Sequence, residues 1–171
     1  MRPVTEGTDR APLAVRPATP DEFERLQWIE LDSERLYETV GIGPFPEDPT
    51  LVGPEGAVIV FAAGDPAVGF VSVALVDGDA HIDQLSVLPG HGGRGIGRDL
   101  LDRAVLWARD EGLSGVTLTT FRDIPWNAPF YQRVGFAVVA DPGPGLAAVR
   151  THERDSGVDA MGPRVAMRFD L

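Results

Sequence analysis

The sequence predicts a single α/β domain built on a mixed, mostly antiparallel sheet. Three apolar runs, Ala57–Ala63, Val68–Val76 and His81–Val87, are separated only by short turns, so we expect three successive antiparallel strands. A helix and a further strand, Val116–Phe121, come next, and a helical crossover of this kind joins two parallel strands. The order of the segments therefore indicates a sheet that is antiparallel in its first half and contains a parallel pair.

The chain before the first helix is predicted to hold a leader and one short strand. Residues 1–12 are polar and show no periodicity, so we expect a loose N-terminal leader. Leu13–Pro17 is predicted as the first strand. With 171 residues in all, the chain has the length of one domain, which we place at residues 13–171.

Two short helices are expected next. Thr19 can cap the first of them, because Pro20 suits the first helical position and Glu22 completes a capping box. The apolar stripe of this helix consists of Phe23, Leu26 and Ile29. A second helix is predicted over Ser33–Val40 and ends at Gly41. Its expected inward residues are Leu36 and Val40.

The stretch from His81 to Trp107 organises the predicted fold. In its strand, apolar and polar positions follow a period of two, which places His81, Asp83, Leu85 and Val87 on one face. The helix that follows runs from Ile96 to about Glu111 and has apolar residues at the three-and-four spacing of one buried face. These residues are Ile96, Leu100, Leu101, Ala104, Val105 and Ala108.

A glycine-rich turn connects this strand to this helix. The segment Gly90–Gly97 has five glycines in eight residues, and a glycine lets backbone N–H groups approach a ligand closely. The N-terminus of a helix adds unpaired N–H groups and the positive end of the helix dipole. The turn therefore predicts an anion site, usually for a phosphate group, and a tight turn without a ligand is the alternative.

The glycine spacing discriminates between phosphate ligands. A dinucleotide fingerprint fits only Gly90, Gly92 and Gly95, which leaves Gly97 unexplained, and the expected acidic residue on a second parallel strand is missing. The P-loop pattern requires Gly-Lys-Ser/Thr, whereas the chain has Gly97-Arg98-Asp99. Neither nucleotide-binding pattern is satisfied.

The C-terminal part predicts two more helices and two more strands. Asn127 can cap a short helix over Ala128–Val134, which Gly135 ends before a strand over Phe136–Val139. A further helix is expected over Leu146–Arg154, and the last strand over Arg164–Phe169 should pair with the strand after Phe136. The proline- and glycine-rich segments Gly43–Pro49 and Asp141–Gly145 are expected to be loops.

Two motifs resemble the GNAT superfamily of acyl-CoA-dependent N-acetyltransferases. The first is Leu85-Ser86-Val87-x-Pro89 followed by Arg94-Gly95-Ile96-Gly97-x-x-Leu100-Leu101, and the second is Phe130-Tyr131-x-Arg133-x-Gly135-Phe136. The resemblance covers Leu13 to Val139. It implies a GNAT-type sheet whose central parallel strands splay apart at the cofactor site, with helices on both faces. It also implies transfer of an acetyl group from acetyl-CoA to a primary amine of a small molecule or peptide.

The resemblance assigns cofactor-binding residues along the first motif. The backbone of Leu85, Ser86 and Val87 would pair with the pantetheine arm as if it were an added strand. The N–H groups of the turn would hold the pyrophosphate, from Gly92 and Gly93 through Arg94, Gly95 and Ile96 to Gly97. Two departures from the family pattern matter here. Gly92 stands where a glutamine or arginine is common, so Arg94 or Arg98 could substitute, and Ile124 replaces a usual asparagine, so Asn127 would either reach the pantetheine or only cap its helix.

The resemblance also assigns an acid and a base. Tyr131 corresponds to the tyrosine that faces the cofactor sulfur and would protonate the leaving thiolate; a tyrosine packed in the core is the alternative. His81 occupies the strand position where a carboxylate base is frequent, and Asp83 could act in its place or orient it. Lining of a polar pocket, with water carrying the proton, is the other reading of this pair.

Composition limits the remaining function classes. The net charge of −11 disfavours binding to nucleic acid or to an anionic membrane surface. The absence of cysteine excludes a thiol nucleophile and a zinc–thiolate site, and we expect no metal and a cytoplasmic location. A homodimer is compatible with these features. A non-catalytic GNAT-fold module that binds acyl-CoA or a partner is the alternative to an enzyme. Acidic residues around the first helices suggest a cationic acceptor, although a solvated helix face explains them equally well.

Overall fold

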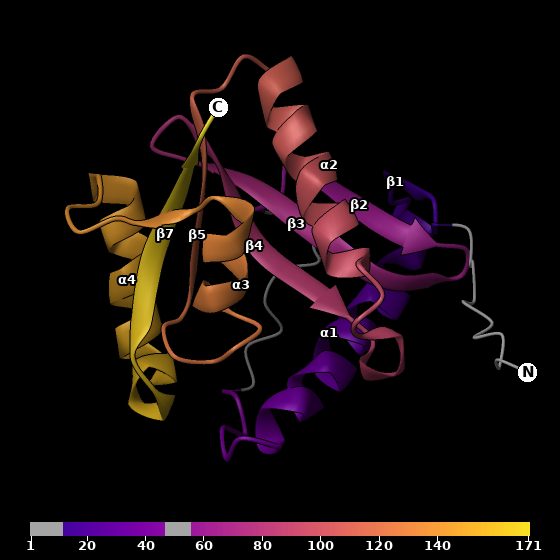
Figure 1. The fold of residues 1–171 in the computed structure, drawn as a ribbon, viewed down its shortest axis with the longest axis horizontal. Coiled ribbons are helices and arrows are strands. Elements are labelled where there is room, and N and C mark those ends of the chain that lie inside the picture. The colour runs from indigo at the N-terminus through magenta and orange to yellow at the C-terminus, as the bar shows by residue number, and fades with distance from the viewer. Residues whose placement is uncertain (1–11, 47–55) are drawn as a thin grey trace, which may run out of the picture.

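The computed structural model describes residues 12–46 and 56–171, which build one seven-stranded sheet (Figure 1). The strand order is β1-β2-β3-β4-β5-β7-β6, and among the described strands only β4 and β5 pair in parallel. The strands are β1 (Val15–Pro17), β2 (Ile59–Gly64), β3 (Ala67–Val76), β4 (Asp79–Val87), β5 (Gly115–Phe121), β6 (Ala137–Val138) and β7 (Arg164–Asp170). The predicted mixed sheet is confirmed, and so is the pairing of the last strand with the strand after Phe136.

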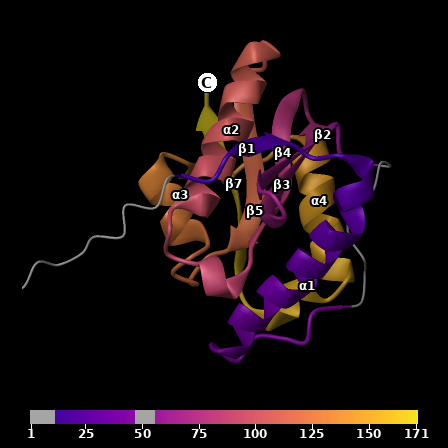
Figure 2. The ribbon, with the colours of Figure 1, turned by 90° about the vertical axis from the view of Figure 1, so that its right-hand side faces the viewer.

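Helices cover both faces of this sheet, as expected. Figure 2 shows α2 and α3 on one side of the strands and α1 and α4 on the other. Their bounds are α1 (Phe23–Glu38), α2 (Ile96–Asp110), α3 (Ala128–Val134) and α4 (Pro144–Asp155). Short 3-10 turns precede α1 and α2 and follow α4: η1 (Pro20–Glu22), η2 (Pro89–His91) and η3 (Val158–Met161).

The local signals in α2 and α3 predicted both helices well. Every apolar residue of the predicted α2 stripe is buried, in a cluster that continues into the strands below. Helix α3 has the predicted bounds, and Gly135 ends it with a φ of +113° in the left-handed region, where glycine is favoured. These two helices therefore form where the amphipathic period and the stop residue agree.

The prediction of two helices between Thr19 and Val40 is wrong. The capping box at Thr19 is present, but η1 leads into one continuous α1 that runs through Ser33. The Ser33 hydroxyl donates to the carbonyl oxygen of Glu30 at 2.7 Å, so it is satisfied inside the helix and starts no new one. Leu36 and Val40, predicted to face inward, are exposed at 38% and 47%.

Helix α4 is held by an aspartate from a distant turn. The carboxylate of Asp77, between β3 and β4, accepts hydrogen bonds from the N–H groups of Gly145 (2.7 Å) and Leu146 (2.9 Å) in the first turn of α4. A Cβ on Gly143 or Gly145 would lie 2.7 Å from a carboxylate oxygen of Asp77, so both glycines permit this close approach. The helix begins at Pro144, two residues before its predicted start.

The expected leader and part of one loop lie outside the described residues. The structure describes only Pro12 of the leader and Gly43–Pro46 of the loop predicted over Gly43–Pro49, where it finds no regular structure. Within the described ranges, no helix has both the length and the apolar character needed to cross a bilayer.

Candidate active site

The parallel strands part in the middle of the sheet. Strands β4 and β5 pair at three positions only, ending with Ile82 opposite Leu118. Beyond this point β4 continues to Val87 and β5 to Phe121, and Figure 1 shows them diverging. Within the described chain, the β5-facing edge of β4 over Leu85–Val87 therefore has no strand beside it. The splayed pair implied by the resemblance is confirmed.

A bulge at Asp83 changes which side chains of β4 share a face. The β3–β4 register shifts there, because Val73 pairs with Ile82 but the preceding Ser72 pairs with Gln84. Ile82, Leu85 and Val87 consequently pack in the core cluster under α2. The expectation that His81 shares a face with Leu85 and Val87 is wrong, since the extra residue resets the alternation.

The splay opens into a cavity of about 640 Å³. Its walls come from β4 and β5 from their last pair onward, from α1 and α4, and from Asn127 and Tyr131 at and within α3. The titratable and aromatic residues among its lining are Glu30, Glu34, Tyr37, Phe45, Asp83, Phe121, Tyr131, His152, Glu153 and Arg164. The cavity thus joins segments that are far apart in the sequence, at the edge where the central strands separate.

Tyr131 projects from α3 to the wall of this cavity. Its side chain is 8% exposed, and its ring lies edge-on to the rings of Phe130 and Phe136, with centroids 5.1 and 5.7 Å away. Burial raises the pKa of the Tyr131 hydroxyl, the nearby Tyr37 adds to this, and the Arg164 guanidinium opposes it. The hydroxyl therefore keeps its proton at neutral pH.

His81 and Asp83 take different places in the site. The His81 ring is 2% exposed, its Nδ1 is hydrogen-bonded to Thr117 Oγ1 at 2.9 Å, and burial lowers its pKa to about 4. Asp83 lines the cavity, and burial raises the pKa of its carboxyl group. The His81 Nε2 lies 3.9 Å from the Asp83 carboxylate, which is too far for a hydrogen bond, so neutral His81 is a close neighbour of Asp83 without a bond to it.

The inner face of α1 changes from apolar to polar along its length. Leu26 and Ile29 are fully buried against the sheet, and the next positions on the same face, at helical spacing, line the cavity. These positions are Glu30, Ser33, Glu34 and Tyr37. The sequence could not separate these carboxylates from the solvent-facing ones, because α1 carries acidic residues on both sides.

Asn127 is fixed by a residue of α1. Its Nδ2 donates to the Tyr37 hydroxyl at 3.0 Å, although the two residues are 90 positions apart in the sequence. Asn127 stands at the N-cap position of α3, but its side chain makes no capping hydrogen bond, so the simple helix-cap reading is wrong. Its Oδ1 is buried, has no hydrogen-bond partner among the described residues and belongs to a side chain that lines the cavity.

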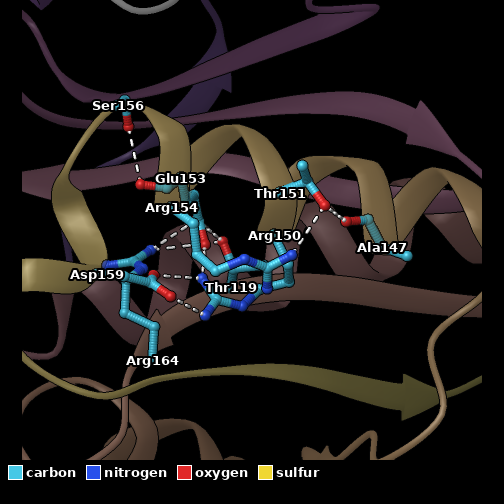
Figure 3. A network of polar contacts seen from close by, with 9 residues as sticks. All are labelled: Thr119, Ala147, Arg150, Thr151, Glu153, Arg154, Ser156, Asp159 and Arg164. Atoms are coloured by element: carbon cyan, nitrogen blue, oxygen red, sulfur yellow. Dashed lines mark hydrogen bonds and ion pairs between the residues drawn. The ribbon is translucent and has the colours of Figure 1, made fainter.

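A partly buried ionic network closes the α4 side of the cavity (Figure 3). Glu153 of α4 accepts hydrogen bonds from Thr119 of β5 and from Arg150, and from Arg164 Nη2 at 2.9 Å. Both Nη atoms of Arg150 also contact the carboxylate of Asp159 at 2.8 Å. These contacts keep the pKa of Glu153 low despite its burial, so Glu153 is charged and neutralises Arg164. No local sequence pattern indicates this network, because its members come from four separate elements.

The glycine turn presents free backbone donors at the start of α2. Asp99 N–H makes the first hydrogen bond of this helix, to the Gly95 carbonyl at 3.0 Å, so the three N–H groups before it, from Ile96 to Arg98, have no helical acceptor. Gly95 has a φ of +81°, in the left-handed region, which explains why a glycine stands at this position. Gly97 has ordinary helical geometry, and a Cβ there would meet nothing closer than 3.9 Å. Crowding inside the protein therefore does not require Gly97.

The other residues that were predicted to bind the anion are less well placed. The N–H of Gly92 already donates to the Pro89 carbonyl at 3.2 Å. Gly93 has a φ of +72° in the exposed part of the turn, and Arg94 is exposed beside it. The guanidinium of Arg98 is paired with Asp102, its Nε lying 2.9 Å from the carboxylate, in an exposed ion pair that a ligand could displace at little cost.

Comparisons with solved structures agree with this architecture. The chain is similar to a GNAT-family acetyltransferase from Staphylococcus aureus Mu50 (16% identity, 93% of this chain and 99% of that one, TM-score 0.71). It is also similar to a GNAT-family acetyltransferase from Brucella melitensis in complex with acetyl-CoA (19% identity, 76% of this chain and 89% of that one, TM-score 0.58). The chain is likewise similar to the ribosomal-protein-S18-alanine N-acetyltransferase of Escherichia coli, with 13% identity over 92% of this chain and 93% of that one and a TM-score of 0.64. At these identities the likeness supports the fold.

Sequence comparison supports the family. The streptothricin acetyltransferase of Streptomyces lavendulae is 36% identical over 108 residues, which are 54% of this chain and 55% of that protein. The chain thus spans about half the length of this curated relative. The model of the Acetyltransferase (GNAT) family matches residues 20–136, which include the glycine turn, both splayed strands and Tyr131. The chain therefore belongs to the GNAT acetyltransferase family.

Proposed function

We propose that this chain transfers the acetyl group of acetyl-CoA to a primary amine of a small molecule or peptide. The observation that carries the proposal is the parting of β4 and β5, which leaves an unpaired strand edge between the free N–H groups of α2 and a cavity that holds Tyr131 and Asp83. The acetyl-CoA complex of the Brucella relative and the activity named for the Streptomyces relative are consistent with it.

The unpaired edge and the turn fit the two ends of acetyl-CoA. The backbone of Leu85, Ser86 and Val87 would pair with the pantetheine arm, and an N–H there would polarise the thioester carbonyl. The pyrophosphate would lie on the N–H groups from Gly93 to Gly97, with Arg94 and Arg98 beside it and the dipole of α2 behind it. Gly97 is consistent with this placement, since space over its Cα is needed only for a ligand.

The chemistry requires one proton to leave the amine and one to reach the sulfur. The amine nitrogen attacks the thioester carbon, a C–N bond forms, the C–S bond breaks, and the product is an amide together with a thiol. Asp83 is the favoured base, because it lines the cavity and its raised pKa brings it closer to that of the proton donor. The His81 ring is buried outside the cavity lining, and burial lowers its pKa to about 4, so Asp83 is the member of the pair that faces the amine.

Tyr131 would return a proton to the sulfur. A raised tyrosine pKa makes the hydroxyl a weaker acid, but a thiolate formed in the same buried place is destabilised by the same loss of water. The difference between the two pKa values governs the transfer, and burial acts on both. Tyr131 therefore keeps its proton until the thiolate appears.

A panel of amines tests the proposal. Purified protein is incubated with acetyl-CoA and each amine, thiol release is followed, and the acetylated product is identified by mass spectrometry. We expect thiol release that depends on the amine and yields an N-acetyl product. Binding of acetyl-CoA without release on any amine would instead favour a non-catalytic module.

A further inference from the structure

One end of the cavity is lined by aromatic rings as well as carboxylates. The Tyr37 ring lies 5.1 Å from that of Phe45 and 5.8 Å from that of Phe121, centroid to centroid, and all three residues line the cavity. Trp126 packs against Tyr37 from behind at 5.7 Å. Aromatic rings grouped in this way attract ammonium groups through their electron-rich faces.

A carboxylate and an amide oxygen lie at the same end. Glu34 stands on α1 one turn before Tyr37, and among the described residues it has no ion-pair partner. The Tyr37 hydroxyl oxygen accepts a hydrogen bond from Asn127 Nδ2, and Asn127 Oδ1 is buried without a hydrogen-bond partner among the described residues. Asn127 is only 8% exposed, and a buried acceptor of this kind is normally hydrogen-bonded, so a donor from a ligand would complete it. Both groups accept hydrogen bonds and suit a ligand that only donates them.

Arg164, a cationic residue that lines the cavity, does not neutralise Glu34. Arg164 is bound to Glu153 and lies over the Phe121 ring, with its guanidinium carbon 4.6 Å from the ring centroid. Its charge is therefore balanced on the α4 side of the cavity. The Glu34 side remains acidic.

We propose that the amine acceptor carries a second cationic group, which binds between the Glu34 carboxylate, the Asn127 carbonyl oxygen and the rings of Tyr37 and Phe45. The inference rests on the proposed function, since it assumes that the reacting amine lies at Asp83 and Tyr131 elsewhere in the same cavity. The substrate class is then a small di- or polyamine. Asn127 on this reading serves the acceptor rather than the pantetheine arm.

Matched amines test this inference. The ratio of kcat/KM for 1,6-diaminohexane to that for hexylamine compares two acceptors that differ in the second ammonium group, and shorter and longer diamines bracket the span. We expect a ratio of about ten or more in the wild type, the factor to which one hydrogen bond to a charged group corresponds. Glu34→Gln and Asn127→Ala should each reduce the ratio towards about two, the statistical factor for a diamine with two equivalent amines. Glu38→Gln removes the same charge from an exposed position on α1 and should leave it unchanged.

A binding measurement separates this inference from the proposed function. Calorimetric titration of 1,6-diaminohexane into protein saturated with coenzyme A should show binding that Glu34→Gln weakens about tenfold and Glu38→Gln does not. Turnover of hexylamine and the diamine at equal efficiency per amine group would overturn the inference while supporting acetyl transfer. Diamine binding that depends on Glu34, without turnover of any amine, would support the cation site and refute the proposed function. Absence of both would refute both.

Discussion

The Nδ1 of His81 lies 2.9 Å from Thr117 Oγ1, across the short stretch where β4 and β5 still pair. The contact is buried directly beneath the point at which the two strands part. Burial of the ring lowers the pKa of His81 and keeps it neutral near pH 7, and the fold therefore has a predictable response to acid.

We expect the free energy of unfolding to fall as the pH drops from about 6.5 towards 4. The His81 pKa is about 4 in the folded state against 6.5 in the unfolded chain, so the unfolded state takes up the proton first. The loss should approach about 1.4 kcal/mol per pH unit and about 3 kcal/mol in total. Urea unfolding at several pH values measures it.

His81→Gln is the control for this response. Asp83 and Glu34, whose pKa values burial raises, act in the opposite direction in acid, so the wild type alone does not isolate the histidine. The pH slope between 6.5 and 4.5 should become flatter in the variant. Equal slopes in both proteins would show that His81 titrates normally.

Gly97→Ala should separate ligand binding from folding. Alanine is the better helix former by up to about 1 kcal/mol, and the site offers room for its methyl group, so the free protein should melt at the same or a higher temperature. The increase in melting temperature that acetyl-CoA causes in the wild type should become smaller, because the methyl group occupies the approach to the N–H groups. Gly95→Ala is the contrasting variant: its φ of +81° predicts lower stability even without ligand. If acetyl-CoA raises the melting temperature of Gly97→Ala as much as that of the wild type, the pyrophosphate does not bind at this turn.

Asp83→Asn should remove the acid limb of the pH–rate profile. The Asp83 carboxyl group must be ionised to accept the proton of the amine. In the wild type, kcat/KM should therefore decrease once the pH drops below the pKa of Asp83, which burial raises above its ordinary value. His81→Gln should lower the rate moderately and keep the limb, because His81 does not line the cavity. If the limb disappears in His81→Gln and persists in Asp83→Asn, the roles of the two residues are reversed.

Sequence reasoning reached the parts of the fold that local signals determine. The amphipathic period of α2, the left-handed Gly135 after α3 and the glycine turn each act within a few residues, so no tertiary information is needed to locate them. The merging of two expected helices into α1 shows the limit of this approach, because Ser33 is compatible with both a cap and a helix interior.

The site depended more on contacts that the sequence does not contain. The bulge at Asp83 is a property of the pairing between β3 and β4, and it moved His81 to the other face from Leu85. Glu34 faces the cavity because α1 packs against β3 and β4, a tertiary contact. The bond between Asn127 and Tyr37 joins two helices distant in sequence, and no local pattern indicates it.

The proposed acetyl transfer depends most directly on Tyr131, and the single-turnover rate of Tyr131→Phe tests this role. The variant keeps the ring and its contacts with Phe130 and Phe136, so stability and acetyl-CoA affinity should change little. Loss of the hydroxyl should lower the rate of acetyl transfer by about a hundredfold to ten-thousandfold, the usual range for a general acid, while KM changes little. A single-turnover rate equal to that of the wild type would contradict the account and make Tyr131 a packing residue.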